Sequence, residues 1–143
     1  MKPSWTKITH VKSSLEAKSN QYAMFIGRWQ PLHDGHRELF NQALNEGKNV
    51  CIAIRDVATD FNNPYTAAQV FMNLTKEFSS FIKQNRMKIV VIPDISSVEF
   101  GRGVGYDIIE HIPPTEIAEI SATKIREQIR QKELSKNDKT KRP

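Results

Sequence analysis

The sequence predicts an α/β fold in which a doubly wound parallel sheet forms a single domain. Two observations predict it. Short apolar segments, bounded by glycine, proline or polar residues, alternate with stretches whose apolar residues recur at helical spacing. The 143 residues, 38% of them hydrophobic and 26% charged, suffice for one domain with its own core. Ligands of such sheets bind beyond the carboxyl ends of the strands, which directs attention to the loops that follow them.

The first half of the predicted domain contains two strands, each followed by a helix. Residues 22–26 form an apolar segment that stops at Gly27, and residues 50–54 form a second one. Both are typical of strands buried on both faces. A helix is predicted between these two strands, and Gly47 lies just after its end. Its apolar residues recur at helical spacing and are Leu39, Phe40, Ala43 and Leu44. The spacing of apolar residues predicts the second helix at residues 66–81.

The second half is predicted to add two more strands and a last helix. Residues 89–92 form the third strand, which Pro93 closes, and residues 116–120 form the fourth. Ser121 is placed to act as the N-cap of a final helix at residues 123–134. The sheet therefore has its ligand edge at the ends of these strands.

The net charge of +5 is concentrated at the two ends of the chain. Residues 1–20 carry +3, residues 21–123 carry −3 and residues 124–143 carry +5. This distribution disfavours a basic nucleic-acid face that runs through the fold, but it suits an anionic ligand met by the ends. We divide the chain into an N-terminal extension (1–20), a domain at residues 21–134 and a basic, mobile tail at residues 135–143.

Several classes of protein are disfavoured by composition. No apolar stretch approaches the roughly 18 residues that span a bilayer, and no signal peptide is visible. The single cysteine, Cys51, has no partner for an intrachain disulfide and is too few for a thiolate metal site. We therefore expect a cytoplasmic protein without a membrane partner.

The loop after the first strand carries two histidines, His33 and His36, on either side of Asp34 and Gly35 at the predicted start of a helix. A helix N-terminus attracts phosphate through its unpaired N–H groups and its dipole. Gly35 allows a phosphate close to the backbone, the imidazoles can donate hydrogen bonds, and Arg28 can add a cationic contact. Zinc is disfavoured because no further ligands of convincing placement follow. An ordinary loop with two histidines is the alternative.

This segment resembles a known signature. Residues 25–36 read Phe-Ile-Gly-Arg-Trp-Gln-Pro-Leu-His-Asp-Gly-His, similar to the His-x-Gly-His motif of the cytidylyltransferase-like nucleotidyltransferase superfamily. The long form is most similar to archaeal-type nicotinamide-nucleotide adenylyltransferases. Residues 120–126, Ile-Ser-Ala-Thr-Lys-Ile-Arg, resemble the second signature, and residues 63–66 resemble a weaker Asn-Pro-aromatic-Thr turn. The resemblance covers about residues 21–132 and implies a Rossmann-like fold.

The resemblance also implies a reaction. An NTP, ATP or CTP, would transfer its nucleoside monophosphate to a small phosphorylated acceptor, with release of pyrophosphate. The catalytic residues implied are His33, His36 and Arg126. The nucleotide-binding residues implied are Gly27, Arg28, Gly35, Ser121 and Thr123. Mg²⁺ is implied as a cofactor held mainly by the NTP phosphates, without a dedicated protein metal site.

The acceptor is less well defined. Asp94, directly after the third strand, and Arg102, in the glycine-rich residues 101–105, are weak candidates to bind it. Each has an alternative reading as an ordinary loop residue. Archaeal-type adenylyltransferases carry a longer insert before the second signature, and residues 67–69 lack the charged residue that they place after the turn. The base therefore stays open, although the long first motif favours ATP.

Other classes of function remain possible. A non-catalytic nucleotide-binding module would keep both signatures, and a nucleic-acid-binding module would use the basic ends. Nucleic acid is the less favoured partner because aromatic residues do not alternate with the basic ones in the tail. A class I aminoacyl-tRNA synthetase core would need a longer chain. A homo-oligomer is also possible.

Overall fold

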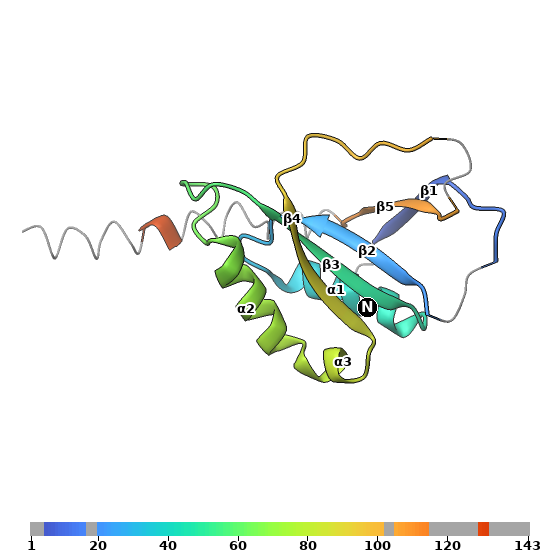
Figure 1. Cartoon of the computed structure of the whole chain (residues 1–143), viewed down its shortest axis with the longest axis horizontal. Coiled ribbons are helices and arrows are strands. Elements are labelled where there is room, and N and C mark those ends of the chain that lie inside the picture. Colours follow the sequence, from blue (N-terminus) through green and yellow to red (C-terminus); the bar gives the residue numbers. More distant parts are fainter. Residues whose placement is uncertain (1–4, 17–19, 102–104, 115–128, 132–143) are drawn as a thin grey trace, which may run out of the picture.

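The computed structural model describes residues 5–16, 20–101, 105–114 and 129–131 (Figure 1). It confirms the α/β class, with a three-stranded parallel sheet of order β2-β3-β4 and a separate antiparallel pair, β1-β5. The elements are β1 (Thr6–Val11), β2 (Tyr22–Gly27), α1 (Asp34–Asn45), β3 (Asn49–Asp56), α2 (Ala67–Glu77), α3 (Ser79–Lys83), β4 (Met87–Pro93) and β5 (Ile108–Ile112). The three strands expected up to Pro93 are therefore present, each extended by one to three residues.

The core lies on one face of the parallel sheet. The strands pair so that Phe25, Ile52 and Ile89 share a register position on this face. Phe40 of α1 is completely buried and packs edge-on against the Phe25 ring, with 5.3 Å between the ring centroids. The remaining large buried side chains of this core are Trp29, Leu44, Val50, Ile54, Val70, Leu74, Phe78 and Met87. The apolar stripes predicted for the helices are thus the surfaces that pack against the sheet.

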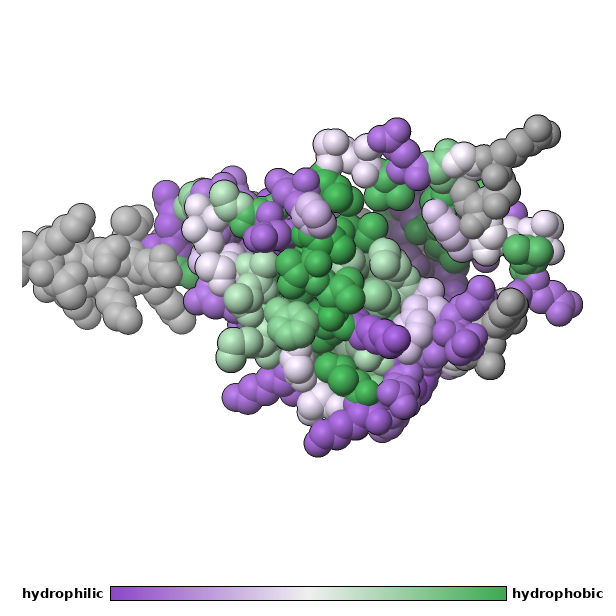
Figure 2. Space-filling model, viewed as in Figure 1, coloured by the Kyte–Doolittle hydropathy of each residue, from purple (hydrophilic) through white to green (hydrophobic). Residues whose placement is uncertain are grey.

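The opposite face of β2 is open, so the expectation that this strand is buried on both faces is wrong. Met24 is 57% exposed and Ile26 is 38% exposed, whereas Phe25 between them contacts the core. Figure 2 shows apolar surface across the middle of the molecule, where the strands lie in Figure 1. The reason is topological. Both connections step the same way across the sheet, and right-handed connections then place both helices on one face.

The second predicted helix is split in two. Thr66 caps α2 as expected, in a capping box with Gln69. At Phe78 the backbone leaves the helical conformation, with φ −104° and ψ 22°, and α3 follows. The Phe78 ring is buried and meets Phe40 at 6.0 Å between centroids. The break keeps the later apolar residues, Phe81 and Ile82, against the core.

The N-terminal 20 residues contain a strand that the sequence did not predict. β1 pairs with β5 in antiparallel register, from Thr6 opposite Ile112 to Val11 opposite Ile108, with an irregularity after Thr9. An ion pair of 3.0 Å between Lys7 and Glu46 links β1 to the end of α1.

The remaining predicted elements lie at the other end of the chain. The predicted strand at residues 116–120 lies outside the described residues. The predicted last helix is helical in its described part, residues 129–131. Among the described residues, no helix is both long and apolar enough to cross a bilayer.

Candidate nucleotide-binding site

The loop between β2 and α1 is organised by its two histidines. His33 is the N-cap of α1, with extended backbone, and its Nδ1 accepts a hydrogen bond from the Gly35 N–H at 3.1 Å. His36 returns the contact, because its Nδ1 accepts from the His33 N–H at 3.3 Å. The two rings stack with 3.7 Å between centroids and 21° between planes. The histidines therefore form a reciprocal capping box at the start of the helix.

These contacts determine which nitrogen of each neutral ring carries the proton. A neutral imidazole has one N–H donor and one acceptor nitrogen. Because Nδ1 of both His33 and His36 accepts from a backbone N–H, the proton belongs on Nε2 in each ring. The Nδ1 atoms thus accept hydrogen bonds from the backbone at the start of α1, and the Nε2 atoms are N–H donors.

His36 is held in its neutral form. Its pKa is lowered to about 3, chiefly by burial and to a smaller extent by the neighbouring charges of His33 and Arg37. The indole of Trp29 meets the His36 ring edge-on at 4.9 Å between centroids. Arg37 is itself engaged with Glu77 at 2.8 Å and Asp34 at 2.8 Å, which raises its pKa. Near neutral pH, His36 is accordingly a donor without charge.

Gly27 has a structural role at the end of β2. A Cβ atom placed on Gly27 would lie 2.9 Å from Cε2 and Cζ2 of Trp29, closer than real side chains approach. Trp29 is 7% exposed, has a positive φ of 53° and donates from Nε1 to the Ala53 carbonyl at 3.1 Å. Gly27 therefore admits the indole, and its predicted contact with nucleotide stays a prediction. Gly35 is buried at the start of α1, and its predicted contact with nucleotide also stays a prediction.

The first motif is joined to the turn that precedes α2. The buried side chain of Gln30 donates from Nε2 to the Tyr65 carbonyl at 2.8 Å and accepts from the Tyr65 N–H at 2.9 Å. Two residues earlier, Arg28 donates from Nη1 to Oδ1 of Asn63 at 3.1 Å. The structure thus brings together two motifs, residues 27–36 and 63–66, that the sequence showed only as separate resemblances.

The described part of the predicted last helix contacts the loop between β3 and α2. The Arg130 guanidinium lies 4.3 Å from the centre of the Phe61 ring, in the loop that follows β3. The second signature itself is not described: Ser121, Thr123 and Arg126 lie outside the described residues, as does Arg102. Their predicted roles remain predictions.

Asp94 lies directly after β4, as expected, but it has a partner there. Arg55, at the end of β3, donates from Nη2 to Asp94 Oδ1 at 2.7 Å and to the Ile95 carbonyl at 3.1 Å. Sequence reasoning missed Arg55 as a residue of this edge. The sequence signal that could have identified Arg55 is its position at the carboxyl end of an apolar strand. The predicted contact of Asp94 with an acceptor is untested.

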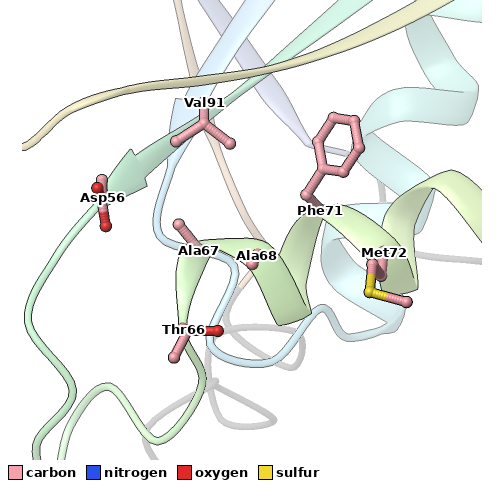
Figure 3. A pocket seen from close by; sticks show the side chains of 7 residues that line it. All are labelled: Asp56, Thr66, Ala67, Ala68, Phe71, Met72 and Val91. Carbon is pink, nitrogen blue, oxygen red and sulfur yellow. The ribbon is translucent and has the colours of Figure 1, made fainter.

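A pocket of about 580 Å³ opens between β4 and the first turns of α2 (Figure 3). Its lining is mostly apolar and consists of Asp56, Thr66, Ala67, Ala68, Phe71, Met72 and Val91. Neither histidine of the first motif lines it. Among the described residues no group of three or more histidine, cysteine or acidic side chains is arranged to hold a metal ion.

Comparison with known proteins supports the resemblance over part of the chain, although no family model matches. The nicotinamide-nucleotide adenylyltransferase of Methanococcus aeolicus is 32% identical over 94 residues, 64% of this chain and 51% of the relative. Enzymes of the same name from Halobacterium salinarum (34% over 59 residues, 40% and 33% of the two chains) and Thermoplasma acidophilum (30% over 64 residues, 43% and 36%) also match. The chain thus spans about half the length, or less, of these relatives.

A parallel α/β sheet with a histidine-capped helix at its carboxyl edge is a Rossmann-like arrangement. The chain is thus similar, over part of its length, to adenylyltransferases of the kind that the motifs resemble.

Proposed function

We propose that the protein is a nucleotidyltransferase that transfers an adenylyl group from ATP to a small phosphorylated acceptor. The observation that carries the proposal is the pair of Nε2 N–H donors of His33 and His36 at the start of α1. Adenylyl transfer is favoured over cytidylyl transfer because the matched relatives are named nicotinamide-nucleotide adenylyltransferases. For the same reason, nicotinamide mononucleotide is the first acceptor to test.

The chemistry requires no enzyme nucleophile. A phosphate oxygen of the acceptor attacks the α-phosphorus of ATP, a new P–O bond forms, and the bond to the bridging oxygen of the β-phosphate breaks. Pyrophosphate leaves with the electron pair of that bond. Negative charge shifts onto the leaving group, so preorganised donors lower the barrier. His36 fits this role because it donates a hydrogen bond without first binding a proton.

Other residues would hold the nucleotide. Arg28, in the loop after β2, would contact the triphosphate, and Gly35, which has no side chain, would allow the phosphates close to the backbone. Ser121, Thr123 and Arg126 would supply the second half of the phosphate site. Mg²⁺ would be held mainly by the triphosphate itself.

Pyrophosphate release tests the proposal. The full chain is incubated with Mg²⁺, each of ATP, CTP, GTP and UTP, and a panel of phosphorylated acceptors that includes nicotinamide mononucleotide. We expect release with one preferred NTP, and only in the presence of an acceptor. Formation of the joined dinucleotide is followed by mass spectrometry. Absence of turnover with every pair, despite binding of an NTP, would favour the non-catalytic nucleotide-binding alternative.

A further inference from the structure

We propose that Asn63 is a positioning residue that, held by Asp60, sets the Arg28 guanidinium for the triphosphate of the nucleotide. The inference rests on the proposed function and deepens it, since it explains how a mobile cation at the site would be prepared for its ligand. Asn63 and Asp60 lie in the loop between β3 and α2, more than 30 residues from Arg28.

The contacts determine the orientation of the Asn63 amide. Its Nδ2 donates to the Asp60 carboxylate at 3.0 Å, and its Oδ1 accepts from Arg28 Nη1 at 3.1 Å. A flipped amide would place its oxygen against the carboxylate and its NH₂ group against the guanidinium, so both contacts would become repulsive. Asn63 is 7% exposed, so little water can reach its amide as an alternative partner.

Asp60 is in turn held by the backbone of its own loop. Its Oδ1 accepts from the N–H groups of Asn62 and Asn63, each at 2.8 Å. Two backbone hydrogen bonds between Asp60 and Asn63, of 3.0 and 3.2 Å, close the turn. The Asp60–Asn63 pair is therefore a preformed support, and Arg28 is the group that it holds.

The support leaves Arg28 able to bind an anion. A guanidinium has five N–H donors, and among the described residues Arg28 uses one of them in a hydrogen bond, the one to Asn63. Because the Asn63 amide is neutral, it orients the cation without neutralising its charge. Holding a long side chain in place before the ligand arrives lowers the ordering cost of binding.

The test is a double-mutant cycle on ligand binding. Calorimetry measures the Kd of the full chain for ATP and for inorganic triphosphate, in wild type, Arg28→Ala, Asn63→Ala and the double variant. We expect Arg28→Ala to weaken binding about tenfold or more and Asn63→Ala about three- to tenfold. In the Arg28→Ala background, Asn63→Ala should have no further effect. Asn62→Ala is the matched control, because only the backbone of this exposed neighbour contacts Asp60, and it should bind as wild type.

Further measurements separate positioning from loss of structure. Asn63→Asp keeps an acceptor beside Arg28 but adds a negative charge, so we expect weaker triphosphate binding and a smaller dependence of Kd on salt. In the turnover assay, Asn63→Ala should raise the KM for ATP while the KM for the acceptor is unchanged. Equal losses from Asn63→Ala with and without Arg28 would show a purely structural role and overturn the inference. Wild-type protein that binds neither probe would overturn both this inference and the proposed function. Normal binding by Asn63→Ala would overturn the inference alone.

Discussion

At the scale of single residues, each histidine of the first motif combines two roles on two different atoms. The Nδ1 atoms of His33 and His36 cap α1, and the Nε2 atoms carry the protons that we assign to phosphate binding. Asparagine places an acceptor oxygen near the position of Nδ1 and has no atom near Nε2. Replacement by asparagine therefore separates the structural role from the chemical one.

We expect His36→Asn to lower kcat by about 10²-fold or more, because a donor to developing charge is lost. Its melting temperature should stay near that of wild type, since the contact with the His33 N–H is retained. His36→Ala is the comparison, because it loses both the Nδ1 acceptor and the Nε2 donor. It should lower both kcat and the melting temperature. Steady-state kinetics and thermal denaturation measure the two effects. Full activity in His36→Asn would remove His36 from the catalytic residues.

The neutral state of His36 predicts how stability depends on pH. Its pKa is about 3 in the folded protein and about 6.5 in an unfolded chain. Between these values the unfolded state binds a proton and the folded state does not, so the stabilisation present above pH 6.5 is lost as the pH falls toward 3. This group contributes a slope of at most about 1.4 kcal/mol per pH unit.

The free energy of unfolding, measured in urea at pH 7 and pH 5, tests this expectation. His36→Asn should show a smaller loss between the two pH values than wild type. The comparison with the variant is needed because burial also lowers the pKa of His111, which acts in the same direction. Identical losses in the two proteins would mean that His36 takes up its proton near pH 6.5 in the folded state.

At the scale of elements, the sequence predicted the helices and strands whose signal lies within their own residues. β2, α1, β3, α2 and β4 each carry their own apolar period, and Thr66 and Gly47 mark helix ends as expected. The break at Phe78 was not predictable, because the apolar spacing continues through it. The β1–β5 pair was missed for a different reason. Thr-Lys-Ile-Thr-His-Val alternates weakly, and its partner lies about 100 residues away.

The same division applies to the site. The position of His33, Gly35 and His36 at a helix start followed from the motif, because a strand, a loop and a helix are local features. The contacts of Arg28 with Asn63 and of Asp94 with Arg55 join segments 35 and 39 residues apart. Nothing in either segment alone specifies such a pair, since the packing of the sheet creates it.

The link between the first motif and the turn before α2 yields a prediction at this scale. Gln30→Met keeps the side-chain volume but removes both hydrogen bonds to the Tyr65 backbone. Each backbone group left unpaired costs about 1–3 kcal/mol, so we expect unfolding to become easier by about 2 kcal/mol or more. Gln69→Ala, which removes the exposed half of a capping box, should cost less than about 1 kcal/mol. Urea denaturation compares the two variants. Equal small losses in the free energy of unfolding would show that the hydrogen bonds between Gln30 and Tyr65 do not stabilise the fold.

At the scale of the whole molecule, the described helices cover one face of the parallel sheet and leave the other face open. Parallel sheets generally have both faces covered, and the connections up to β4 supply helices to one face only. The open face of β2 carries Met24 and Ile26, in alternation with Phe25 on the core side. The predicted fourth strand and most of the predicted last helix lie outside the described residues, so this asymmetry concerns the sheet up to β4.

Two substitutions on neighbouring residues of β2 test the asymmetry in solution. Met24→Gln on the open face should change the free energy of unfolding by about 0.5 kcal/mol or less. Phe25→Ala on the core face should cost about 3 kcal/mol or more, because it leaves a cavity beside Phe40. Both are measured by urea denaturation of dilute protein. A large cost for Met24→Gln would mean that this face is buried in solution.

The indole of Trp29 gives the protein an optical reporter at its proposed site. The chain has two tryptophans, and Trp29 is the one that contacts His36 and supports the loop after β2. Its emission should respond to any ligand that engages the neighbouring imidazole. With Trp5→Phe, intrinsic fluorescence would come from Trp29 alone among the tryptophans. Titration of unlabelled nucleotides, and stopped-flow measurement of their arrival, would then need neither a dye nor a coupled enzyme.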